Sequence, residues 1–206
     1  MLIKHRNNKP IVDSTAYIAP TAVIVGKVEV GPRSRIMYGA VLDSEGSEVK
    51  IGEYSIICEN SVIRATDTGS EKHPVLVGDH VFIGPQSTVL GCIVAPGSYL
   101  ATGVTVLQGA KINSGGVVAV GALVHANTVI PKDFFVPPHT VAIGNPVQVF
   151  GPDEKEAMAK AIMSLGFARI AFNIEVAGKS RGEIYKEATV IRSKEFGHHD
   201  GDEIVN

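Results

Sequence analysis

The chain has 206 residues, of which 45% are hydrophobic and 19% charged, with 22 glycines and no tryptophan. This length suffices for one well-buried domain, and the abundance of glycine, valine and isoleucine favours strands and turns over a helical bundle. The net charge of −2 argues against nucleic acid or an anionic membrane as partner. The sequence predicts a cytoplasmic protein for three reasons. It has only two cysteines, its N-terminal segment does not resemble a leader, and it has no apolar run of the ~18 residues needed to span a membrane.

From residue 12 to residue 136 an aliphatic side chain recurs at every sixth position, in four registers. Neither a helical period nor simple alternation accounts for this spacing, whereas short strands joined by tight corners do. Three such hexads make one roughly triangular coil, so the sequence predicts an all-β solenoid of about seven coils. The aliphatic positions are Val12, Ile18, Ile24, Val30, Ile36, Leu42, Ile51, Ile57, Ile63, Val77, Ile83, Val89, Val94, Leu100, Val106, Ile112, Val118, Val124, Ile130 and Val136.

The hexad series is interrupted at three places. It gains three residues between Leu42 and Ile51, gains eight before Val77 within RATDTGSEKHP, and loses one just before Val94. A solenoid accommodates insertions as loops at its corners, and such loops commonly carry contacts or function.

The C-terminal part of the chain has a different pattern. Residues 1–150 are predicted to form the solenoid domain. Residues 151–176 (GPDEKEAMAKAIMSLGFARIAFNIEV) predict a C-terminal α-helix that packs on the solenoid or on a neighbour, weakened in its middle by Gly166. Residues 177–206 are predicted to be a charged extension, part of which can be disordered. His198 and His199 lie in this extension and are interpreted as tail residues.

The hexad ladder resembles the left-handed parallel β-helix of the hexapeptide-repeat superfamily, and the order of its segments resembles the γ-class carbonic anhydrase-like branch. The resemblance covers about residues 10–175. It rests on YIAPTAVIVGKVEVGPRSRIMYGAVL (17–42), IGEYSIICENSVI (51–63), IGPQSTVLGC (83–92) and IGNPVQVF (143–150). The closing GNP is also similar to many acyltransferases of the superfamily.

The resemblance implies a homotrimer with active sites between subunits, where three histidines from two subunits hold zinc or a similar divalent ion. Water bound to such an ion loses its proton near neutral pH and attacks carbon dioxide. The positions that correspond to the three histidines are Arg64, Pro85 and Leu90 in this sequence. Arginine stays protonated, and proline and leucine offer no side-chain donor, so this set cannot ligate zinc in the usual way.

The residues around the expected zinc site also differ from the family pattern. An Arg-Gly-Asp run is replaced by Asp43, Ser44 and Glu45, and a Gln-Asp pair is replaced by Cys58 and Glu59. We therefore expect a trimeric scaffold or small-ligand binding protein without a metal or cofactor. In this hypothesis, Arg64 pairs with carboxylates across the subunit boundary in place of zinc.

Two alternatives remain open. In an acyltransferase, His73 in EKHPVLVG would take the proton from a hydroxyl or amine that attacks an acyl-CoA thioester; an ordinary surface-loop histidine is the competing interpretation. In a metal-dependent hydratase, a rebuilt site would use residues such as Cys58 and His73. Cys58 is disfavoured as a nucleophile because no base lies nearby in sequence. The sequence does not identify the small-molecule ligand.

Overall fold

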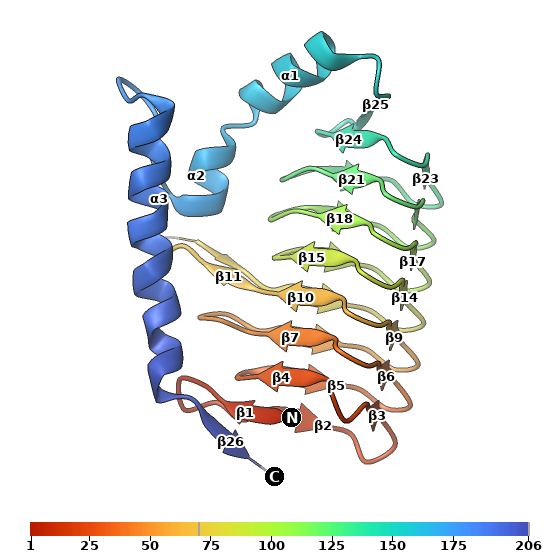
Figure 1. Cartoon of the computed structure of the whole chain (residues 1–206). Coiled ribbons are helices and arrows are strands. Elements are labelled where there is room, and N and C mark those ends of the chain that lie inside the picture. Colours follow the sequence, from red (N-terminus) through yellow and green to blue (C-terminus); the bar gives the residue numbers. More distant parts are fainter. Residues whose placement is uncertain (70, 206) are drawn as a thin grey trace.

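The computed structural model describes residues 1–69 and 71–205, and its main body is a β-solenoid of about eight turns built from three parallel sheets (Figure 1). The predicted fold class is confirmed. The turns exceed the predicted seven because the stack continues past the hexad series at both ends, at β1 (Leu2–Lys4) and β24 (Val141–Ile143).

Each turn except the last, which contributes only β24, contributes one short strand to each sheet. We name the sheets by a central strand. The parallel strands of the β10 sheet are β1, β4 (Val23–Val25), β7 (Val41–Asp43), β10 (Val62–Arg64), β15 (Thr88–Leu90), β18 (Thr105–Val106), β21 (Leu123–Val124) and β24. Two antiparallel strands, β25 (Gln148–Phe150) and β26 (Glu203–Val205), lie at its two edges. The β14 sheet contains β3 (Tyr17–Ile18), β6 (Arg35–Ile36), β9 (Ile56–Ile57), β14 (Phe82–Ile83), β17 (Tyr99–Leu100), β20 (Val117–Val118) and β23 (Phe135–Val136). The β13 sheet contains β2 (Ile11–Val12), β5 (Val28–Val30), β8 (Val49–Ile51), β13 (Val75–Val77), β16 (Ile93–Val94), β19 (Lys111–Ile112) and β22 (Val129–Ile130).

The core of the solenoid consists of the hexad aliphatic side chains. All of them are buried except Val12 and Ile18, which lie in the first coil and are partly exposed. In-register pairing stacks each aliphatic on the equivalent residue of the next coil, as Ile63 stacks between Leu42 and Val89. The six-residue period therefore encodes the burial pattern directly.

The eight-residue insertion forms an antiparallel hairpin of β11 (Thr66–Asp67) and β12 (Lys72–His73). The hairpin projects from the corner between the β10 and β13 sheets, toward α3 (Arg181–Phe196) (Figure 1). The insertion thus carries His73 at the end of a strand.

The segment predicted as one helix over residues 151–176 forms two, α1 (Lys155–Ser164) and α2 (Phe167–Phe172). Between them Gly166 adopts a left-handed conformation with φ +64°, which interrupts the helical hydrogen bonds. Phe167 packs edge-on against His125, with ring centroids 5.6 Å apart, and burial lowers the pKa of that imidazole. A neutral histidine therefore holds α2 on the solenoid.

Residues 181–205, which we call the C-terminal segment, return along the whole stack (Figure 1). They comprise α3 (Arg181–Phe196), the 3₁₀ helix η1 (Gly197–Gly201) and β26. Ser180 and Glu183 begin α3 with a reciprocal capping box. At its far end, β26 pairs antiparallel with β1, so the last strand of the chain lies beside the first.

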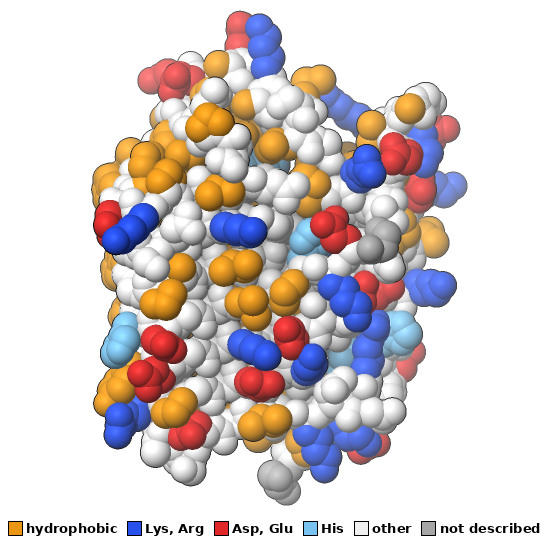
Figure 2. Space-filling model, turned by 180° about the vertical axis from the view of Figure 1, so that it is seen from behind, with side chains coloured by type: hydrophobic (Ala, Val, Ile, Leu, Met, Phe, Trp, Pro, Cys, Tyr) orange, Lys and Arg blue, Asp and Glu red, His pale blue; other side chains and the backbone are white. Residues whose placement is uncertain are grey.

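The outer faces of the sheets differ in polarity. The β14 sheet presents a nearly continuous apolar ladder in register: Tyr17, Arg35, Ile56, Phe82, Tyr99, Val117 and Phe135. Figure 2 shows the β13 sheet from behind, with charged side chains among the apolar ones, while apolar side chains gather along the left edge, toward the β14 sheet. None of the helices among the described residues has the length and apolar character to span a bilayer.

Candidate functional site

Three of the positions singled out by the sequence lie side by side on the β10 sheet. Arg64 on β10 is in register with Asp43 on β7 and with Leu90 on β15. The residue before each of them is fully buried, so alternation along the strand directs these three side chains outward. The strand ends therefore bring together a carboxylate, a guanidinium and an aliphatic side chain.

Three other substituted positions lie at the opposite end of these strands. Cys58 and Glu59 follow β9, and Pro85 follows β14, at the corner where the chain enters the β10 sheet. The backbone N–H of Gln86 donates a 2.9 Å hydrogen bond to the backbone carbonyl of Glu59, which stacks the two turns. Within one chain, Pro85 is thus separated from Arg64 and Leu90 by the length of a strand.

Glu45 lies in the turn after β7, where the Asp43 carboxylate accepts a 2.9 Å hydrogen bond from its amide. Only 4% of Glu45 is exposed, and burial together with the Asp43 charge raises the pKa of its carboxyl group, opposed by Arg64. Its Oε1 lies 3.8 Å from Arg64 Nε, and neither atom has a hydrogen-bond partner among the described residues. Within the single chain the Arg64 guanidinium therefore faces the Glu45 carboxylate, because this turn returns Glu45 to β10. The pairing of Arg64 across a subunit boundary stays a prediction.

The C-terminal segment covers this end of the strands. The Arg64 guanidinium lies over the Phe196 ring at 5.6 Å, and Arg6 pairs with Glu195 at 3.0 Å. Together with the β1–β26 pairing, these contacts place η1 beside Asp43 and Glu45.

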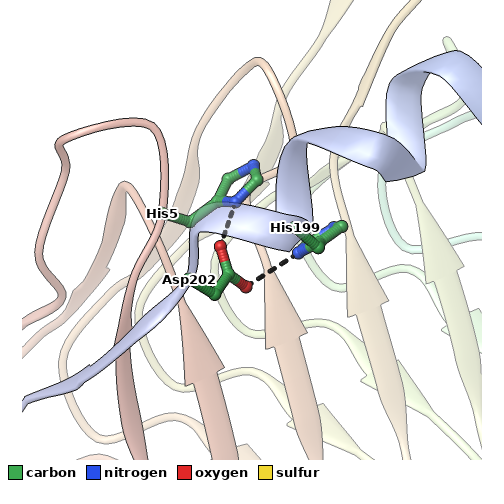
Figure 3. Close-up of side chains that lie close together, drawn as sticks. All are labelled: His5, His199 and Asp202. Carbon is green, nitrogen blue, oxygen red and sulfur yellow. Dashed lines mark hydrogen bonds and ion pairs between the residues drawn. The ribbon is translucent and has the colours of Figure 1, made fainter.

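His5, His199 and Asp202 form a chain of contacts where η1 meets the first coils (Figure 3), and Asp43 lies beside His199. Asp202 lies 2.6 Å from His5 Nδ1 and 2.9 Å from His199 Nδ1, and the two rings stack at 4.3 Å. Burial opposes ionisation of Asp202, but the hydrogen bonds from His199 and His5 outweigh it and hold the pKa of Asp202 below its usual value. The other nitrogen of His199, Nε2, lies 3.7 Å from Asp43 Oδ2.

Sequence reasoning missed this cluster because it interpreted His199 as a tail residue. The only local signal was the run HHDGD at residues 198–202. That run does not show which residues it meets, since its position depends on the pairing of β26 with β1. Possible metal ligands meet here in two sets, His5 with His199 and Asp202, and Asp43 with Glu45 and His199; within each set the ligand atoms lie within 4.8 Å of one another.

His73 lies in a second candidate site. It is only 7% exposed, its Nε2 is 3.7 Å from Glu71, and this nitrogen has no hydrogen-bond partner among the described residues. A cavity of about 420 Å³ opens beside it. A Cβ added at Gly91 would lie 2.6 Å from the His73 Cβ, so this glycine lets the hairpin approach the coil. The cavity is lined by residues 71–74, 91–93, 109–111, Asn127 and Val129.

The two cysteines are free and buried. Burial, with a contribution from Glu59, raises the pKa of the Cys58 thiol to about 11, and burial also raises the pKa of Cys92. Both thiols are therefore protonated near neutral pH, which makes them poor nucleophiles and poor metal ligands.

Comparison with known proteins adds sequence relatives and structural neighbours. No family model matches the chain. The chain is 38% identical over 125 residues to the mitochondrial gamma carbonic anhydrase 1 of Arabidopsis thaliana, a match that covers 60% of the chain and 46% of the plant protein. It is 29% identical over 149 residues to a carbonic anhydrase of Geobacillus kaustophilus, covering 72% and 76% of the two chains.

The matches to the plant relatives thus span about half the length of those proteins. A crystal structure of a hexapeptide transferase family protein from Anaplasma phagocytophilum aligns over 98% of each chain, with a TM-score of 0.57 and 21% identity, which supports the fold alone. The sequence relatives of this chain are γ-carbonic anhydrase-like, and its fold is the β-solenoid of the hexapeptide-repeat proteins.

Proposed function

We propose that this chain is a γ-carbonic anhydrase-like scaffold or small-ligand binding protein that does not hydrate carbon dioxide through the three-histidine zinc site of that family. The register of Arg64 with Leu90 carries this proposal. The strands hold the two positions next to each other, as a metal site requires, but the side chains are a guanidinium and an aliphatic group. A divalent ion does not fit this set, since it needs neutral imidazole, thiolate or carboxylate donors.

We further propose that the chain acts as a homotrimer. The apolar ladder of the β14 sheet supports this assembly because Tyr99 and Phe135 are 44% and 54% exposed in the single chain, and exposed apolar patches commonly mark association surfaces. The division of the substituted positions between the two ends of the β10-sheet strands also suits a site shared by neighbouring subunits. Light scattering should give three times the 21.7 kDa mass of one chain.

The test of the proposed function is a stopped-flow assay of carbon dioxide hydration. Tag-free protein is treated with a chelator and assayed with and without added Zn²⁺. We expect the uncatalysed rate in both cases, because Arg64, Pro85 and Leu90 provide no ligand. A zinc-dependent rate that grows with protein concentration would contradict the proposal.

The His73 cavity favours a second candidate function, acyl transfer from an acyl-CoA. His73 lines a cavity of about 420 Å³, and its buried Nε2 has no hydrogen-bond partner among the described residues, so this imidazole could accept a proton from an attacking hydroxyl or amine. Calorimetric titration with acetyl-CoA should show saturable binding that the His73→Ala variant loses and the exposed-histidine variant His198→Ala keeps. Absence of binding to the wild-type chain would exclude this candidate.

A further inference from the structure

We propose that Asp43, Glu45 and His199 form a divalent metal site within a single chain, with Asp202 as a residue that positions His199. This site differs from the positions at which the family resemblance places zinc ligands, and it goes beyond the proposed function. The C-terminal segment creates it by bringing η1 over the ends of β7 and β10.

The separation of the donor atoms suits one shared ion. His199 Nε2 and Asp43 Oδ2 are 3.7 Å apart, too far for a hydrogen bond. Two ligands bound to one ion at about 2.0–2.2 Å are typically ~3–4 Å from each other. Glu45 contributes the third donor, and the three ligand atoms lie within 4.8 Å of one another.

The two ring nitrogens of His199 have different environments. Nδ1 lies 2.9 Å from Asp202, and in the tautomer that donates this hydrogen bond the lone pair of Nε2 is directed toward Asp43 and available to an ion. Metal-binding histidines usually have this arrangement, in which a carboxylate fixes the tautomer and the ring orientation. His5 occupies the other oxygen of Asp202 and stacks on the His199 ring, which fixes both groups further (Figure 3).

Glu45 provides independent support for a ligand. Its side chain is 2% exposed, and Oε1 has no hydrogen-bond partner among the described residues. A buried carboxylate oxygen without a partner is costly, and the 3.8 Å approach of Arg64 Nε does not make a hydrogen bond. A bound cation would satisfy this oxygen.

The donor set indicates the class of ion. One imidazole and two carboxylates suit a first-row divalent ion such as Zn²⁺ or Mn²⁺ better than Ca²⁺. The side chains of His199 and Asp43 are 29% and 14% exposed, so an ion can enter from solvent and keep water in its remaining positions.

The experiment uses the full, tag-free chain after chelator treatment. Equilibrium dialysis against Zn²⁺ or Mn²⁺ should give about one ion per chain. We expect His199→Ala to weaken binding by at least ~100-fold, and Asp202→Asn by ~10–100-fold, as for other outer hydrogen-bond partners of metal ligands. The matched control is His198→Ala, which removes the exposed neighbouring histidine and should bind like the wild type. With bound Mn²⁺, electron spin-echo spectroscopy should detect one histidine nitrogen, absent in His199→Ala.

Two results would overturn this inference: no saturable binding of either ion at millimolar concentration, or equal affinity in the wild type and His199→Ala. Circular dichroism of each variant verifies that the fold is retained. Failure here is separable from failure of the proposed function. Metal binding without carbon dioxide hydration supports both proposals, whereas zinc-dependent hydration that requires His199 supports the site and contradicts the proposed function.

Discussion

Replacing Ile63 with alanine is expected to lower the free energy of unfolding by about 2–5 kcal/mol. Ile63 is fully buried and stacks between Leu42 and Val89 in the column of aliphatic side chains. Hydrogen bonds to β7 and β15 hold the backbone on both sides, so the surroundings cannot close over the lost atoms and a cavity remains. Urea unfolding followed by far-ultraviolet circular dichroism would measure the loss, since the chain has no tryptophan.

The matched control for this prediction is Ile93→Ala. It removes the same atoms from a strand of the same solenoid, but Ile93 points outward from the β13 sheet and is 36% exposed. We expect this variant to lose less than about 1 kcal/mol. Similar losses in the two variants would mean that the aliphatic column is not the main source of stability.

The double substitution Arg64→His with Leu90→His is expected to bind Zn²⁺ at least ~10-fold more tightly than its parent chain. The two positions are in register on β10 and β15, so two imidazoles would lie side by side. The Asp43 and Glu45 carboxylates adjoin them and could complete the coordination or orient the rings. Competition with a chromophoric chelator would measure the affinity, in a His199→Ala background that removes the site proposed above.

The control for the double histidine variant uses the same two strands. Val62 and Thr88 are also in register, so Val62→His with Thr88→His places two imidazoles side by side, two residues away from the acidic turn. We expect weaker zinc binding than in the first pair. Equal affinities would show that Asp43 and Glu45 add nothing to zinc binding at this surface.

The solenoid could be predicted from sequence because its determinant is local and repeated. Each hexad places one aliphatic side chain in the core, so Leu100 or Ile130 could be assigned without knowing any distant contact. The break in the helix over residues 151–176 was harder to predict, since glycine at position 166 is compatible with either a weak helix or a left-handed turn.

The candidate sites could be predicted only in part. Arg64 and Leu90 were located because they follow hexad aliphatics, and the repeat fixes their register. The approach of His199 to Asp43 was not predictable, because it depends on how a charged helix returns along the stack. Likewise, the burial of His73 follows from a hairpin whose packing on Gly91 has no signature in the local sequence.

The pairing of β26 with β1 has a consequence for the order in which the molecule can be completed. Coils can stack from the N-terminus while the ribosome is still adding residues, since each coil needs only its predecessor. The strand that pairs with β1 follows every coil of the solenoid in the sequence. The first coil therefore keeps one exposed edge while the coils stack, and the arrival of β26 both covers that edge and delivers His199. A polypeptide truncated before residue 197 would still contain the coils but would lack this histidine, so the metal site proposed above could form only after the C-terminal segment has docked.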